Sequence, residues 1–255
     1  MAVDEALFRE RIRRRGPPTL RFYGWQTPAV SLGRFQDPRR EIDADACRRL
    51  GIPIVRRPTG GKAVLHDREL TYAVVAGDDV PPFPPDILAT YRLISDCIVA
   101  GLARAGIRAE IEQEGRGPAE GTLRASCFAA SSRYELLVGG RKICGSAQVR
   151  SGGCFLQHGA LLMAFDPGLS CDVLLPGGDR ERHLARLRSA VTSVGEHAGG
   201  GVDEALLCRL LREAFAARLG IRFREGELTA AEEGLARELQ AERYGAGTGE
   251  DRGDG

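Results

Sequence analysis

The stretch RYELLVGGRKICGSAQVRSGGCFLQHGALLM, residues 133–163, decides the fold. It contains three strand-like runs, RYELLV, KICGSAQVR and CFLQHGALLM, separated by GGR and SGG. Glycines in such short connections supply the backbone conformations that hairpin turns require. The stretch therefore predicts a meander of three antiparallel strands.

Upstream of this meander, predicted strands and helices alternate. We expect a strand pair from TLRFYGW and AVSLGRF, a helix across DADACRRLG, and strands at IPIVRRP and ELTYAVVAG. The clearest helix is PPDILATYRLISDCIVAGLARAGI, whose apolar residues recur at helical spacing and which closes at Gly106. A short strand, RAEIEQ, and a long loop over residues 114–130 follow it. This order predicts an α+β fold with a mixed, mostly antiparallel β-sheet flanked by helices.

The C-terminal third reads as helical from about residue 170. We predict a short strand at IRFREG and a last helix through AAEEGLARELQAERY. The ending GAGTGEDRGDG is rich in glycine and acids and has too few apolar residues to pack. We therefore expect one domain over residues 1–243 and a disordered tail over residues 244–255.

Composition excludes several classes of protein. Hydrophobic residues make up 43% and charged residues 28% of the chain, which is typical of a soluble globular protein. A net charge of +1 gives no overall field for nucleic acid or a membrane surface. No apolar run approaches the ~18 residues that a spanning helix needs, and MAVDEALFRERI does not resemble a signal peptide. We expect a cytoplasmic protein that binds neither nucleic acid nor membranes.

The cysteine pattern argues against disulfides and zinc. There are seven cysteines, no two are closer than ten residues, and no C-x-x-C occurs. The chain also has neither a P-loop nor a G-x-G-x-x-G motif. We therefore expect no metal site and no cofactor, and most of the cysteines should be small buried apolar residues.

An arginine cluster ends the first predicted helix, which runs from about Val3 to Arg14 before GPP stops it. Its members are Arg11, Arg13, Arg14 and Arg15. The cluster is either a solvated helix end or a docking patch for an acidic protein.

A glycine-containing segment, RRPTGGKAVLHD at residues 56–67, is a candidate binding loop. Adjacent glycines let backbone N–H groups approach an anion or a carbonyl oxygen, although they also suit a plain hairpin turn. The two arginines alternate along the preceding strand, so only one of them can face the cleft. His66, in this segment, is the better histidine candidate for contact with substrate.

The strand KICGSAQVR carries the second candidate group. On a regular strand Lys142 shares one face with Cys144, Ser146, Gln148 and Arg150, a polar set that faces either solvent or a cleft. Gly145, in mid-strand, is tolerable where a ligand or another backbone approaches. The apolar strand that follows contains His158, which is either a hydrogen-bonded core residue or part of the site.

These segments together resemble the lipoate/octanoate branch of the biotin/lipoate protein ligase and acyltransferase superfamily. The resemblance covers about 165 residues, from MAVDEAL and RFYGWQTPAVSLGRFQD through RRPTGGKAVLHDRELTYAVV to KICGSAQVRSGGCFLQHGALL. Within it the chain looks most like the octanoyltransferases of Gram-positive bacteria. That family carries C-F-x-A-x-S-x-Y-E-L and then G-R-K-x-x-G-S-A-Q, where this chain reads CFAASSRYEL and GRKICGSAQ.

The resemblance implies an octanoyltransferase of lipoate biosynthesis. It implies Cys127 as the nucleophile that carries the acyl group as a thioester, and Lys142 as its essential partner. The donor would be octanoyl-acyl carrier protein, and the acceptor a lysine of a lipoyl domain such as glycine cleavage H protein. The substrate-binding residues would be Arg57, Thr59, Gly60, Gly61, Lys62, His66, Gly145, Ser146, Ala147, His158 and Gly159.

Chemistry agrees with that assignment. A thiol attacks as the thiolate, and a nearby ammonium lowers its pKa from ~8.5. Lys142 would supply this cation, and Gly60 and Gly61 would hold the oxyanion. Apolar strand faces would line a tunnel for eight carbons, worth ~0.8 kcal/mol per buried methylene.

Two departures from the family pattern stand out. Members usually have a strand before the match to MAVDEAL, so the resemblance leads us to expect that this chain starts late. Arg133 stands where they usually carry tryptophan, which concerns a wall of the pocket and not the chemistry.

Three other activities stay open. ATP-dependent lipoate–protein ligases share the fold and resemble R-R-x-x-G-G-G in the glycine loop, where this chain has Lys62 as the third residue. An amidotransferase between lipoyl domains also uses a cysteine but lacks the RRPTGG form. A non-catalytic paralogue that binds an acyl carrier is the third alternative, and an intact Cys127 and Lys142 argue against it.

Overall fold

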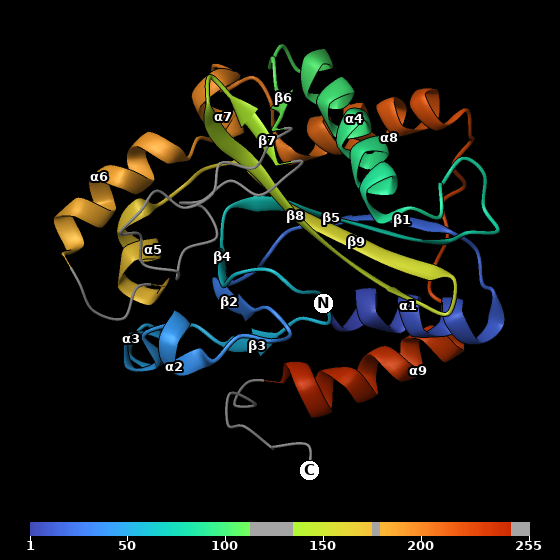
Figure 1. Cartoon of the computed structure of the whole chain (residues 1–255), viewed down its shortest axis with the longest axis horizontal. Helices are drawn as coiled ribbons and strands as arrows, with labels where there is room; N and C mark the ends of the chain where they lie inside the picture. The colour runs from blue at the N-terminus through green and yellow to red at the C-terminus, as the bar shows by residue number, and fades with distance from the viewer. Residues whose placement is uncertain (113–134, 175–178, 246–255) are drawn as a thin grey trace.

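Six strands form the large sheet of the molecule. In sheet order they are β1 (Thr19–Tyr23), β5 (Glu69–Gly77), β9 (Cys154–Leu162), β8 (Arg141–Ser151), β7 (Leu136–Val138) and β6 (Glu110–Ile111). Every neighbouring pair is antiparallel, and the long strands β5, β9 and β8 form its centre (Figure 1). The structure, a computed structural model, describes residues 1–112, 135–174 and 179–245.

The meander predicted from the sequence is confirmed. β7, β8 and β9 follow one another through tight turns at Gly139–Gly140 and Gly152–Gly153, and all four glycines have positive φ. The sheet is therefore built around the stretch of residues 133–163, and the predicted α+β class holds.

A second, smaller sheet contains the glycine loop. Its strands are β3 (Ile54–Arg56), β2 (Ala29–Leu32) and β4 (Val64–His66) in that order, with β2 parallel to β3 and antiparallel to β4. The expected pairing of TLRFYGW with AVSLGRF is therefore wrong, because β1 pairs with β5 while β2 belongs to the small sheet. The segment expected as a loop, TGGKAVLHD, also contributes the strand β4.

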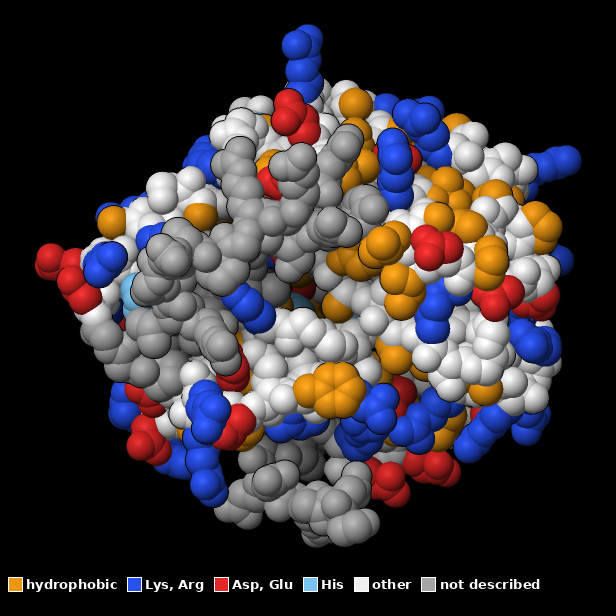
Figure 2. Space-filling view, in the orientation of Figure 1, with side chains coloured by type: hydrophobic (Ala, Val, Ile, Leu, Met, Phe, Trp, Pro, Cys, Tyr) orange, Lys and Arg blue, Asp and Glu red, His pale blue; other side chains and the backbone are white. Residues whose placement is uncertain are grey.

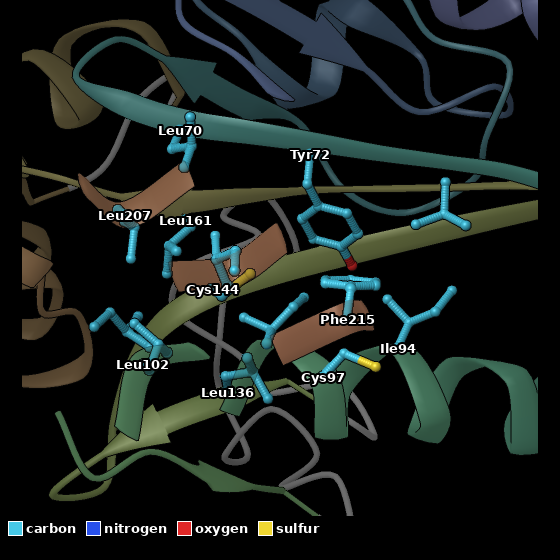
Figure 3. Packing of buried hydrophobic residues seen from close by; sticks show 14 of the residues in the cluster. Leu70, Tyr72, Ile94, Cys97, Leu102, Leu136, Cys144, Leu161, Leu207 and Phe215 are labelled. Atoms are coloured by element: carbon cyan, nitrogen blue, oxygen red, sulfur yellow. The ribbon is translucent and has the colours of Figure 1, made fainter. Parts of the chain in front are cut away.

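One face of the large sheet is covered by two long helices, α4 (Ile87–Arg104) and α8 (Glu204–Leu219) (Figure 1). Their apolar side chains meet those of β5, β8 and β9 in the main hydrophobic core (Figure 3). Labelled members of that core include Tyr72, Cys144, Ile94 and Phe215. We call this side the helix-packed face.

The opposite face of the same sheet is covered in part by α1 (Ala2–Arg14), which rests on Ala73, Val75 and Leu156. Helix α9 (Ala230–Leu239) lies against the outer side of α1 (Figure 1). The small sheet and its loops approach the rest of this face, so we call it the loop-packed face.

Short helices complete the chain. They are α2 (Pro38–Glu41), α3 (Ala44–Arg49), α5 (Pro167–Leu174), α6 (Arg180–Ala190) and α7 (Val194–His197). Residues of β2, α3, β4 and α5 share a separate apolar cluster beneath the small sheet. Within the described part of the chain, no helix combines the length and apolar character needed to cross a membrane.

The C-terminal part differs from expectation in two places. Residues 221–226, expected as a strand, form neither a helix nor a strand. After α9 a π-helical turn, Gln240–Tyr244, continues the chain, and the hydroxyl of Tyr244 donates to Glu5 at 2.5 Å. Tyr244, placed in the tail by the sequence, is therefore packed against α1, and residues 246–255 lie outside the described residues.

Candidate active site

A β-bulge decides which way Lys142 points. Leu136 pairs with Cys144 while its neighbour Leu137 pairs with Lys142, so β8 has one extra residue, Ile143, opposite β7. A bulge shifts the alternation of side chains, and Ile143 and Cys144 both enter the main core. A side-chain carbon built on Gly145 would lie 2.9 Å from the Lys142 Nζ. Lys142 therefore lies on the loop-packed face, and the expectation that it shares a face with Cys144 is wrong.

The ammonium of Lys142 is buried, with only 2% of its side chain exposed. Its Nζ lies 2.5 Å from the Oε1 of Glu135, which is equally buried. Such a pair keeps the lysine charged in a place where an isolated cation would be costly. Glu135 was not predicted from the sequence, although it is the acid of the YEL segment in the pattern the chain shares with octanoyltransferases.

The helix-packed face holds the other polar residues of β8. The hydroxyl of Ser146 lies 2.7 Å from that of Tyr72, and Gly159 provides the space beside both side chains. Burial raises the pKa of Cys144 to about 12, so this thiol stays protonated at neutral pH. The structure thus separates Ser146 and Gly159, predicted as substrate-binding residues, from the side chain of Lys142.

Arg57 organises the glycine loop. The alternation predicted for the two arginines is confirmed, because Arg57 is buried while Arg56 donates to backbone carbonyls of the neighbouring loop. The Nη2 of Arg57 donates to the carbonyl of Gly60 at 2.9 Å and to that of Lys62 at 2.6 Å. Gly61 between them has φ +95°, and a Cβ there would lie 2.8 Å from Arg57 Nη2.

The glycine loop docks on the same face of the large sheet as Lys142. A Cβ on Gly61 would lie 4.0 Å from the Cβ of Ala147, two residues along β8 from Gly145. The Thr59 hydroxyl also lies 2.7 Å from the Nε2 of His158 on β9. The predicted meeting of the glycine loop with the lysine strand is therefore present. In the view of Figure 2 the surface is hollowed near the centre of the molecule.

Both histidines of interest are buried and hydrogen-bonded. Burial lowers the pKa of His158 to about 3, so its imidazole is neutral at physiological pH. His66 lies between the Ser31 hydroxyl, 2.7 Å from its Nε2, and the Glu69 carboxylate, 2.8 Å from its Nδ1. Neither imidazole is open to bulk solvent, so a substrate could reach them only from within the protein interior.

Cys127 and residues 114–130 lie outside the described residues. Among the residues that the structure describes, no group of three or more His, Cys, Asp or Glu side chains could hold a metal ion. What is described is a buried ammonium beside a glycine loop whose carbonyls are turned toward Arg57. Such a cation and such backbone amides suit a reaction in which negative charge develops on a carbonyl oxygen.

Known proteins share both the sequence and this architecture. The model of the lipoyl protein ligase A/B catalytic domain family matches residues 1–216. The octanoyltransferase LipM of Kyrpidia tusciae is 42% identical over 246 residues, covering 94% of this chain and 90% of its own. The LipM of Symbiobacterium thermophilum is also 42% identical, over 96% of this chain and 90% of its own.

A solved structure gives the same fold. The bipartite lipoate protein ligase of Thermoplasma acidophilum superposes with a TM-score of 0.78 at 30% identity, over 95% of this chain and 87% of that one. The match to the family over 216 residues and the 42% identity to two octanoyltransferases lead to one conclusion. The chain belongs to the lipoyl protein ligase A/B catalytic domain family and, within it, to the LipM octanoyltransferases.

Proposed function

We propose that this chain moves an octanoyl group from acyl carrier protein to a lysine of a lipoyl domain, such as that of glycine cleavage H protein, through a thioester on Cys127. The observation that carries the proposal is the buried Lys142 ammonium on the face of β8 where the glycine loop docks. A fixed cation inside a water-poor site favours both a thiolate and a developing oxyanion.

The reaction divides into two acyl transfers. In the first, the thiolate of Cys127 attacks the carbonyl carbon of the octanoyl thioester, and the C–S bond to the carrier breaks. The carrier leaves as its thiol after taking up a proton. In the second, the neutral amine of the acceptor lysine attacks the carbonyl carbon of the enzyme thioester, an amide forms as the C–S bond breaks, and the proton lost by the amine goes to the sulfur of Cys127, which is released as its thiol. No oxidant, metal or nucleotide is consumed in either step.

Lys142 would serve both transfers. Its ammonium would stabilise the Cys127 thiolate before the first attack and the carbonyl oxygen during both. The paired carboxylate of Glu135 would keep this lysine protonated and hold its side chain over Gly145. The N–H groups of the glycine loop would add donors to the same oxyanion.

The second candidate is an ATP-dependent lipoate–protein ligase. It is favoured by the structural match at 30% identity to a protein described as a lipoate protein ligase. Such a ligase would use Lys142 with an acyl-adenylate and would need no nucleophilic cysteine. The two candidates therefore differ in their dependence on ATP and on Cys127.

Intact mass spectrometry separates the candidates. Incubation with octanoyl-acyl carrier protein, without ATP, should add one octanoyl mass that hydroxylamine removes. Cys127→Ser should lose this adduct and abolish transfer to a lipoyl domain. Cys144→Ser is the matched control and should retain the adduct, because that thiol is buried on the other face. Transfer by Cys127→Ser at the wild-type rate, and only with ATP, would establish the ligase.

A further inference from the structure

A chain of buried hydrogen bonds leads from Glu69 to the glycine loop. The Glu69 Oε1 faces the His66 Nδ1 at 2.8 Å, the His66 Nε2 faces the Ser31 Oγ at 2.7 Å, and the Arg57 Nη1 donates to that Oγ at 3.0 Å. Arg57 then holds the carbonyls of Gly60 and Lys62. The four side chains come from β5, β4, β2 and the residue after β3, so the chain ties the two sheets together.

The direction of each bond follows from the donors available. The Glu69 carboxylate can only accept, so the His66 Nδ1 carries a proton and donates it to Glu69. In the neutral imidazole the Nε2 then accepts from the Ser31 hydroxyl, whose oxygen in turn accepts from Arg57. The Glu69 carboxylate thus fixes the tautomer of His66, and His66 fixes the orientation of the Ser31 hydroxyl, which accepts a hydrogen bond from Arg57.

Several contacts hold Glu69 itself in place. Its Oε1 also accepts from the Thr71 hydroxyl at 2.6 Å and from the Trp25 Nε1 at 3.1 Å. The indole of Trp25 stacks on the His66 ring, with centroids 4.4 Å apart and planes 15° apart. The ring of His66 is therefore fixed in its plane as well as at both nitrogens.

The second oxygen of this carboxylate indicates a role beyond stability. Glu69 is 1% exposed, and its Oε2 has no hydrogen-bond partner among the described residues. A buried and half-satisfied carboxylate lowers stability compared with a fully paired one. Its negative charge lies on the far side of His66 from Ser31 and Arg57, where it orients the imidazole proton.

The hydrogen-bond chain ends at the glycine loop, which docks on the face of the large sheet where Lys142 lies. Because the carbonyls of Gly60 and Lys62 are drawn to Arg57, the trans peptide groups direct the N–H of the following residues to the opposite side of the loop. Gly61 lies next to both Arg57 and β8, since a Cβ there would be 2.8 Å from the Arg57 Nη2 and 4.0 Å from the Ala147 Cβ. The position of Arg57 therefore sets the direction of the loop amides.

We propose that Ser31 and Glu69 are positioning residues for acyl transfer, which act through His66 and Arg57 to fix the amides of the glycine loop. They touch neither the acyl group nor the nucleophile in this role. The inference rests on the proposed function for its effect on rate, but the loop geometry can be measured without any turnover.

The first measurement is hydrogen–deuterium exchange of the intact protein. Glu69→Gln keeps the size of the side chain but removes the charge, and deuterium uptake in a peptide covering residues 58–65 should rise. Glu5→Gln is the matched control. Glu5 is also a buried carboxylate that accepts from Arg243 and Tyr244, but it lies between α1 and the C-terminal turn. The Glu5→Gln variant should be less stable than wild type, but deuterium uptake in the peptide covering residues 58–65 should not change.

The second measurement is steady-state transfer of octanoyl groups from the carrier to a lipoyl domain. Glu69→Gln and Ser31→Ala should each lower kcat by about ten- to a hundredfold, the scale of a misplacement of ~1 Å, with KM for the carrier unchanged. Because both act through one chain, the double variant should be no slower than the slower single variant. If the two residues instead had independent structural roles, their separate reductions in kcat would multiply in the double variant.

The exchange result decides the inference. Wild-type uptake over residues 58–65 in Glu69→Gln overturns it whatever the rate does, and Ser31→Ala provides the same decision if Glu69→Gln does not fold. A wild-type protein that transfers no octanoyl group would overturn the proposed function instead, while the exchange comparison would still hold or fail by itself.

Discussion

The two faces of the large sheet are made by the same strands yet carry opposite chemistry. On the helix-packed face, Cys144 and Cys97 lie among apolar side chains, and burial raises the pKa of each thiol to about 12. On the loop-packed face, Lys142 is charged and paired, and His158 joins the glycine loop to β9. One bulge, at Ile143, sends a lysine and a cysteine two residues apart to these different environments.

This difference shows where reactivity can arise in the fold. A thiol packed between a sheet and helices stays protonated, because its desolvation outweighs the attraction of nearby donors and cations such as Ser146 and Lys142. A lysine on the other side stays charged because the Glu135 carboxylate is paired with it. We therefore expect acyl transfer to take place on the loop-packed face.

The largest effect is expected from Lys142→Ala. Removal of one preorganised donor costs about 10²–10³ in rate, and loss of one member of a buried ion pair costs about 3–5 kcal/mol of stability. Transfer should be measured well below the unfolding temperature of the variant. Glu135→Gln is the comparison, since it keeps the Lys142 side chain but removes the carboxylate that holds it protonated; it should lose stability, and it should lose less activity than Lys142→Ala. Equal rates for Lys142→Ala and wild type would remove the lysine from the mechanism.

The sequence predicted that the glycine loop and the Lys142 strand meet, because each segment is continuous and can be read from a short motif. The alternation of Arg56 and Arg57 could also be predicted, although not which of the two is buried. The face of Lys142 could not, since an alternating pattern gives no sign of a bulge. That bulge depends on how β7 pairs with β8, which is a tertiary property.

The incorrect predictions about the fold have the same cause, which is that strand pairing is a tertiary property. Adjacent strands usually pair, so β1 and β2 were expected to form a hairpin, but β1 finds β5 at the edge of the large sheet. Residues 221–226 have strand-like alternation, yet the structure gives them no neighbouring strand. Local patterns identify which segments can be strands, while long-range pairing decides which of them are.

A smaller effect on rate is expected from Gly145→Ala. The new methyl group would lie 2.8 Å from the Cε and 2.9 Å from the Nζ of Lys142, so the flexible end of the lysine must move by a few tenths of an ångström. We expect about tenfold slower transfer, because catalytic groups tolerate little displacement. Thermal denaturation should change little.

Gly159→Ala is the matched control on the other face. Its methyl group would lie 2.4 Å from the Tyr72 Cε1 and 2.8 Å from the carbonyl of Gly145, a rigid environment. Such overpacking costs about 1–3 kcal/mol. Gly145→Ala should therefore lose mainly transfer rate, and Gly159→Ala mainly stability. A stable but slow Gly159→Ala together with an unstable but fast Gly145→Ala would contradict the assignment of the two faces.

Low pH should lower the free energy of unfolding of the protein through His158, which lies on the loop-packed face. Burial lowers the pKa of this histidine from 6.5 to about 3, so the unfolded chain binds its proton first as pH falls. Stability from this group is complete above about pH 6.5 and decreases by about 1.4 kcal/mol per pH unit toward pH 3. Urea unfolding of wild type and His158→Gln across this range measures the difference. Parallel pH profiles for the two proteins would show that His158 does not titrate in this way.

The smallest effect is expected from the arginines at the end of α1. Arg11 is buried against Asp79, and the exposed Arg13 and Arg14 each lie 3.2 Å from the carboxylate of Glu10. Ile12 contacts the turn at Gly152, at the end of β8 opposite Lys142. At ~3.3 Å per residue the two ends of this strand are about 30 Å apart.

A carrier docked at that helix end would have to deliver its acyl group over this distance. The solvated helix end is thus the better interpretation of the arginine cluster than a docking patch. Gln at both Arg13 and Arg14 should leave the transfer rate within about twofold, the scale of exposed ion pairs. The dependence of KM for the carrier on salt should also match wild type, since a true electrostatic dock loses strength when charges beyond ~10 Å are screened. A flatter salt dependence in the double variant would show that the arginine cluster is a docking patch after all. The carrier would then have to reach Lys142 along the length of β8.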